Sequence, residues 1–247
     1  MMRTANPALN DNTFSGYGRA IAAGDTMTIQ GTVNKTFALL LLTIFGAAWT
    51  WKLYYAGTGA LGIWIIGGAI GGFIVALITV FKKTWAPVTA PLYAVLEGLV
   101  LGGISSMLEG AYPGIVIQAV GLTFGTLFGL LFAYKSGMIR ATENFKLGVV
   151  AATGGIMVVY LVTMALGFFG IRMPYIHDSG LIGIGFSLFV VVVAALNLVL
   201  DFDFIESGAA QGAPKYMEWY GAFGLMVTLI WLYMEILRLL SKMRSRR

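Results

Sequence analysis

The chain has 247 residues, of which 58% are hydrophobic and only 11% are charged, and it contains 33 glycines. A soluble domain of this length carries about 25% charged residues, so the composition excludes an ordinary water-soluble protein and indicates an integral membrane protein. The lack of cysteine excludes disulfides, a thiol nucleophile and a zinc–thiolate site. The net charge of +5 suits anionic lipid headgroups better than nucleic acid, which we do not expect as a partner.

Residues 1–34 are rich in Asn, Gly, Ser and Thr, and no apolar run follows the first methionine. We therefore expect no cleaved signal peptide and interpret this segment as a flexible polar tail. Its end, TMTIQGTVNKT at residues 26–36, is a candidate for a short helix that packs on the membrane surface. The rest of the chain, residues 35–247, is predicted to form a transmembrane helical bundle.

Seven apolar segments follow, each close to the roughly 20 residues that a helix needs to cross the hydrocarbon of a bilayer. Short linkers join them, so neighbouring helices should pack antiparallel in an all-α, polytopic membrane bundle. Glycines recur on single helical faces of the second and fourth segments and predict tight helix contacts there. The predicted spans are 36–53, 61–81, 87–107, 114–133, 147–169, 181–200 and 219–240. The glycines are Gly67, Gly68, Gly71 and Gly72 in the second span, and Gly121, Gly125 and Gly129 in the fourth.

Basic residues in the linkers predict that the N-terminus lies inside, because lysine and arginine are enriched in cytoplasmic loops. Seven crossings would then place the basic C-terminal end, with Lys242 and Arg244, outside, against the same rule. Two alternatives stay open: the last segment crosses, or it enters as a segment that turns back. In either case we expect it to lie centrally among the other six. The counts place Arg3, Arg19, Lys35, Lys82, Lys83, Lys135, Arg140, Lys146 and Lys215 inside, and Lys52 and Arg172 outside.

Five of the eleven acidic residues fall in or beside the last two apolar segments: Asp201, Asp203, Glu206, Glu218 and Glu235. Carboxylates at membrane depth are costly, and they persist mainly where they pair, face water or handle cations and protons. Asp203 and Glu206 are interpreted as loop neighbours that support Asp201. Glu218 is interpreted as a solvated loop charge.

Glu235 and Arg238 lie three residues apart on one helical face, where an ion pair would lower the cost of each charge. A straight last helix that begins near Trp219 would carry Glu235 about 24 Å along its axis. Asp201, at the end of the sixth span, meets Glu235 only if the last helix begins nearer the cytoplasm or turns back.

Glu97 lies near the middle of the third span. It either supports a cation path or is a protonated carboxyl group that bonds a neighbouring helix, and the sequence leaves both readings open. Enzymatic motifs are missing: the sequence has no HExxH, no GxSxG and no histidine within the spans. We therefore expect no enzymatic activity and no required cofactor.

Three stretches resemble the Bax inhibitor-1/YccA-like (TMBIM) family, in particular its bacterial branch: PLYAVLEGLVLGGIS, LNLVLDFDFIESG and EWYGAFGLMVTLIWLYMEILRLL. The resemblance covers nearly all of the chain beyond the tail and implies a bacterial cytoplasmic membrane protein. It also implies a pH-sensitive calcium leak that is gated by a carboxylate pair, here Asp201 and Glu235. Glu235 departs from the family, which usually has aspartate at this position.

The expected mechanism is that two carboxylates in a poorly solvated site do not both ionise, so the pair retains a proton and acts as a switch. Loss of the proton would change contacts with Arg238 and admit a transient Ca²⁺ at Asp201 and Glu235. Its partners would be the lipid bilayer, Ca²⁺ and H⁺. The alternative, also implied by the resemblance, is a regulator that transports nothing and binds another membrane protein, for example a membrane-bound protease. A small-solute carrier is disfavoured because the sequence shows no internal repeat.

Overall fold

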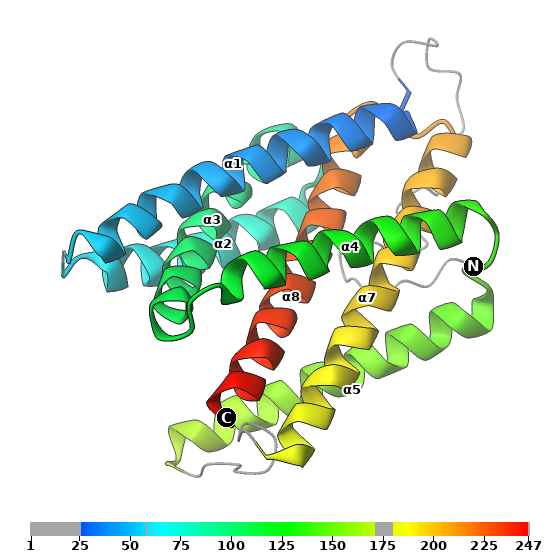
Figure 1. Cartoon of the computed structure of the whole chain (residues 1–247). Coiled ribbons are helices and arrows are strands. Elements are labelled where there is room, and N and C mark those ends of the chain that lie inside the picture. The colour runs from blue at the N-terminus through cyan, green and yellow to red at the C-terminus, as the bar shows by residue number, and fades with distance from the viewer. Residues whose placement is uncertain (1–25, 58, 171–179, 247) are drawn as a thin grey trace. The chain divides into compact units, whose positions relative to one another are not determined.

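The computed structural model describes residues 26–57, 59–170 and 180–246. Residues 1–25, which hold most of the predicted tail, and residues 171–179 lie outside this range. Seven long helices, each long and apolar enough to cross a membrane, make up most of the described chain, so the predicted all-α bundle is confirmed (Figure 1). They are α1 (Ile29–Tyr55), α2 (Leu61–Phe81), α3 (Ala86–Ala111), α4 (Ile115–Lys135), α5 (Glu143–Phe168), α7 (Leu181–Ala210) and α8 (Met217–Ser245).

Two helices depart furthest from the predicted boundaries, α1 at its start and α7 at its end. The helix α1 begins at Ile29, where the Thr28 hydroxyl caps it by accepting a hydrogen bond from the Gly31 N–H at 2.9 Å. The predicted surface segment is therefore the first turns of the spanning helix itself. The helix α7 continues to Ala210, ten residues beyond the predicted end of its span, so Asp203 lies within a helix rather than in a loop.

The chain divides into two compact units. The α1–α3 unit consists mainly of Asn12–Pro113 and Asp203–Val227, and the α4–α5 unit mainly of Gly114–Phe202 and Thr228–Arg247. Each of the helices α7 and α8 has one end in the α1–α3 unit and the other end in the α4–α5 unit. In the α1–α3 unit, α3 packs against both α1 and α2.

Glycines allow the backbones of the α1–α3 unit to approach closely. A Cβ atom at Gly98 of α3 would collide with the Thr43 carbonyl oxygen of α1, and one at Gly68 of α2 would lie 2.7 Å from the Leu96 carbonyl oxygen of α3. The predicted contacts of the second span are thus confirmed at Gly68. The prediction that the glycine face of α4 packs closely against another helix was wrong. No described atom lies within 4 Å of a Cβ placed at Gly121, Gly125 or Gly129.

Because Gly98 is closely packed and Gly121 is not, replacing each of them by alanine should have opposite effects on stability. Gly98→Ala should destabilise the protein by about 1–3 kcal/mol, because the added methyl group forces α1 and α3 apart. Gly121→Ala should leave stability unchanged or raise it by up to about 1 kcal/mol, because alanine is the better helix former and meets open space. Thermal unfolding in a mild detergent measures both. Equal effects at the two sites would contradict the close approach of α1 and α3.

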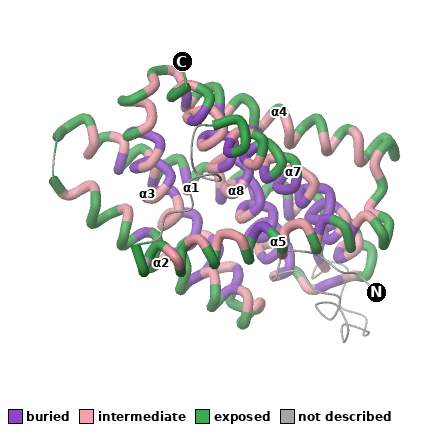
Figure 2. The backbone as a smooth tube through the Cα atoms, turned by 90° about the horizontal axis from the view of Figure 1, so that it is seen from below, coloured by how far each residue is buried: buried purple, intermediate pink, exposed green. Residues whose placement is uncertain are grey.

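Burial is concentrated on three helices, α3, α7 and α8 (Figure 2). Within the most apolar 18-residue stretch of each helix, 56% of the residues are buried in α3 and in α8, against 11% in α5. The predicted central position of the last helix stays a prediction. The helix α8 is continuous from Met217 to Ser245, so the alternative of a segment that turns back was wrong.

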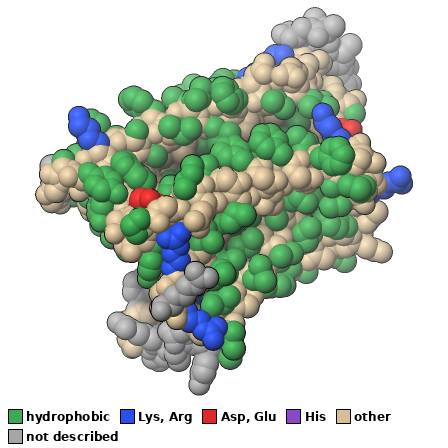
Figure 3. All heavy atoms as spheres, viewed as in Figure 1, with side chains coloured by type: hydrophobic (Ala, Val, Ile, Leu, Met, Phe, Trp, Pro, Cys, Tyr) green, Lys and Arg blue, Asp and Glu red, His purple; other side chains and the backbone are tan. Residues whose placement is uncertain are grey.

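Large hydrophobic side chains cover the outer faces of the helices, and charged side chains are sparse on the face shown in Figure 3. Phe45, Phe73 and Phe128 are each more than half exposed. A water-soluble protein rarely exposes apolar surface so extensively. These faces are suited to the hydrocarbon of a bilayer.

Candidate functional site

Asp201 is fully buried on α7. Neither of its carboxylate oxygens accepts a hydrogen bond of good geometry from any residue that the structure describes, and the side chain of Thr228 on α8 lies beside the carboxyl group. A carboxylate in such surroundings is costly in its ionised form. Asp201 is therefore the acidic side chain whose environment most requires a proton or a cation.

The proximity of Asp201 to Thr228 follows from the positions of the two residues along α7 and α8. They run antiparallel, as shown by Lys242 near the end of α8, which bonds the Gly183 carbonyl and the Ser187 hydroxyl near the start of α7. Asp201 lies nine residues before the end of α7 and Thr228 eleven residues after the start of α8, which is about 14 and 16 Å along the respective axes. The two side chains consequently lie at similar heights.

Glu235 lies two turns further along α8 and has different partners. Its side chain is 2% exposed and forms an ion pair with Arg238, whose Nη1 lies 2.9 Å from Oε1 and 3.0 Å from Oε2. The Tyr160 hydroxyl of α5 donates a hydrogen bond to Oε1 at 3.0 Å and accepts one from Arg238 Nη1 at 2.7 Å. The predicted ion pair is confirmed. Tyr160 was missed, because a tyrosine in an apolar span carries no charge pattern that would single it out.

The two acids of the predicted switch therefore occupy separate positions. Thr228 and Glu235 share one face of α8 but lie about 10 Å apart along its axis, and the oxygens of Asp201 bond no described residue. A hydrogen-bonded pair of Asp201 and Glu235 is not formed in this structure. Within the described residues, no three His, Asp or Glu side chains come together as a metal site. Calcium prefers six to eight oxygen ligands, so the transient Ca²⁺ expected at Asp201 and Glu235 stays a prediction.

The supporting acids lie in the α1–α3 unit. Asp203 is half-buried and Glu206 exposed on the last turns of α7. Glu97 is half-buried on α3, where its Oε1 would lie 3.0 Å from a Cβ atom placed at Gly72 of α2. Gly72 thus provides the space that the Glu97 carboxyl group occupies between α2 and α3.

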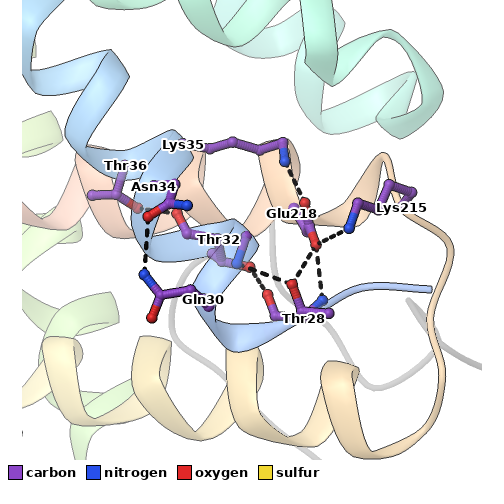
Figure 4. Close-up of polar contacts among 9 residues, drawn as sticks. Thr28, Gln30, Thr32, Asn34, Lys35, Thr36, Lys215 and Glu218 are labelled. Carbon is purple, nitrogen blue, oxygen red and sulfur yellow. Dashed lines mark hydrogen bonds and ion pairs between the residues drawn. The ribbon is translucent and has the colours of Figure 1, made fainter. Parts of the chain in front are cut away.

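Glu218 was predicted as a solvated loop charge, and that prediction was wrong. Its side chain is fully buried in the first turn of α8 and forms ion pairs with Lys35 of α1 and, at 3.0 Å, with Lys215. It also accepts hydrogen bonds from the Thr28 N–H at 2.9 Å and the Thr28 hydroxyl at 2.8 Å (Figure 4). We refer to Thr28, Lys35, Lys215 and Glu218 as the Glu218 clasp.

The clasp joins the start of α1 to the turn that precedes α8. Beside it, the Met27 N–H donates to the Ala213 carbonyl at 2.6 Å, and Thr26 and Pro214 form an isolated β-bridge. A Cβ atom at Gly31 would collide with the Glu218 carboxylate, so a larger residue at that position of α1 would displace this carboxylate from its partners. Sequence alone could not indicate this site, because 183 residues separate Lys35 from Glu218.

Comparisons with known proteins identify one match. A family model described as Bax inhibitor 1 like matches residues 6–245. No curated protein and no solved structure matches the chain.

Proposed function

The chain belongs to the Bax inhibitor 1-like family, and from this premise we propose that it is a proton-gated leak pathway for cations, chiefly Ca²⁺, without enzymatic activity. Seven helices of sufficient length and apolarity make it an integral membrane protein. We place it in a bacterial cytoplasmic membrane with the N-terminus inside. This orientation rests on the lysines and arginines of the linkers.

The observation that carries the proposal is the burial of Asp201 without a hydrogen bond to any described residue. With a proton, Asp201 is neutral and compatible with close packing of α7 on α8. Without the proton, its charge has no ion-pair partner among the described residues, and it favours entry of water or a cation between the helices. Protonation of one side chain thus biases two packing arrangements, as a switch requires.

Glu235 contributes differently in this proposal. Its carboxylate holds the guanidinium of Arg238 beside Tyr160, so the charges of α8 are paired while the helix is packed against α5. For Asp201 and Glu235 to share a cation, Glu235 would have to leave Arg238 and α8 would have to move along its axis. Cation entry is therefore coupled to a rearrangement of the Glu235 ion pair.

Calcium flux into proteoliposomes tests the proposal. Wild-type flux should rise as the pH rises, because loss of the Asp201 proton opens the packing. Asp201→Asn, which cannot ionise, should give a low flux with little pH dependence. Glu235→Gln should raise the flux at low pH, because Arg238 is no longer held.

Glu109→Gln is the matched control, since it removes an acid to which we assign no role, and it should behave as the wild type. Wild-type flux with unaltered pH dependence in both Asp201→Asn and Glu235→Gln would remove the basis of the proposed switch. Wild-type protein that conducts no cation at any pH would instead favour a membrane regulator that transports nothing.

A further inference from the structure

An apolar groove lies along α5 and α8 within the α4–α5 unit. One hollow of about 320 Å³ is lined mainly by Ile156, Met157, Leu161, Met164 and Trp231. A second hollow of about 270 Å³ is lined by Tyr160, Thr163, Met164 and Arg238. The two hollows adjoin, because both are lined by Tyr160 and Met164. We refer to them together as the groove; its lining is mainly apolar, with the Arg238 guanidinium at one end.

Arg238 has hydrogen-bonding capacity left at this end of the groove. Its hydrogen bonds to Glu235 and Tyr160 are all made by Nη1, and its Nε and Nη2 bond no residue that the structure describes. Its side chain is 40% exposed and lines the second hollow. The free edge of a guanidinium is a two-pronged donor that fits the oxygens of a phosphate group.

The depth of the groove matches the layout of a phospholipid. Arg238 lies seven residues before the end of α8, and Trp231 lies seven residues further from that end, which separates them by about 10 Å along the helix axis. The guanidinium is thus close to the membrane interface, while the apolar hollow extends toward the hydrocarbon.

The charge at this end of α8 also suits an anionic headgroup. The last two turns of α8 add Lys242 and Arg244 to Arg238, against the single acid Glu235.

We propose that this groove binds a phospholipid with a net negative headgroup from the surrounding bilayer. One acyl chain lies against Ile156, Leu161 and Trp231, and the phosphate accepts hydrogen bonds from Nε and Nη2 of Arg238. This site does not depend on cation conduction, because it requires only the static geometry of α5 and α8.

Native mass spectrometry of the detergent-purified protein, titrated with phosphatidylglycerol or phosphatidylcholine of the same chain length, tests the site. The wild type should retain phosphatidylglycerol about tenfold more tightly, which corresponds to about 1.4 kcal/mol. Arg238→Lys keeps a charge beside Glu235 but loses the two-pronged donor, so it should lose most of this preference. Met164→Trp should fill the groove and weaken binding of both lipids.

Val158→Trp is the matched control, because Val158 is an exposed residue of α5 that does not line the groove. It should bind both lipids as the wild type does. Equal affinity of the wild type for the two lipids would overturn the proposal, and so would unchanged binding in Met164→Trp. The second variant leaves Arg238 and Glu235 intact, so the test remains valid even if Arg238→Lys folds poorly.

Discussion

Glu218→Gln should lower the free energy of unfolding by about 2–3 kcal/mol, one of the two largest effects that we expect from a single substitution. Glutamine has nearly the shape of glutamate and can still accept a hydrogen bond from Thr28, but it carries no charge. Lys35, only 19% exposed, then loses its counter-ion inside the protein. Breaking a buried ion pair by removing one partner costs more than the pair itself contributes, because the remaining charge stays desolvated.

Thermal unfolding of the purified protein in a mild detergent measures this loss. Glu206→Gln is the control: Glu206 lies exposed near the end of α7, and loss of its charge should cost less than about 0.5 kcal/mol. In a double-mutant cycle, Glu218→Gln and Lys35→Gln should cost clearly less together than the sum of the single losses. Additive losses would show that Lys35 and Glu218 do not interact.

Arg238→Met should destabilise the protein by about 3 kcal/mol. Methionine fills much of the same volume but leaves the buried Glu235 carboxylate with the Tyr160 hydroxyl as its remaining hydrogen-bond donor among the described residues. We take the lower end of the range for broken buried pairs, because Arg238 itself is partly exposed.

The matched test for this pair is the double variant Glu235→Gln, Arg238→Met. It removes both charges, so no buried charge is left without a partner. It should therefore be more stable than Arg238→Met alone, although the Glu235 carboxylate is also replaced. Thermal unfolding of the wild type and the two variants under identical conditions measures these differences. A double variant less stable than Arg238→Met would mean that Arg238 acts through packing on the Tyr160 ring, which its guanidinium covers at 5.4 Å.

The position of Asp201 has a consequence for how the switch can operate. Because α7 continues nine residues beyond Asp201, this acid lies inside a packed helix pair and not at a solvated helix end. In the proposed mechanism, a proton or cation would reach it when α7 and α8 separate or water enters between them. The proposed gate is therefore a change in helix packing.

The sequence by itself determined the class of the protein, the number of apolar helices and the Glu235–Arg238 ion pair. These features are local: hydrophobic runs of spanning length specify helices in a membrane, and residues three apart on a helix share a face whatever surrounds it. The family resemblance, too, rests on contiguous motifs, and the match over residues 6–245 confirms it.

Only the tertiary structure decided which acids are buried and what they contact. Glu218 was misjudged because its partners come from the start of α1, and Asp201 lies opposite Thr228 because of where α7 ends and α8 begins. Helix ends in the chain interior shift by several residues without a clear sequence signal, and each residue moves a side chain by about 1.5 Å along the axis. Contacts between distant segments depend on these accumulated shifts, so they follow from the packed helices and not from any one stretch of sequence.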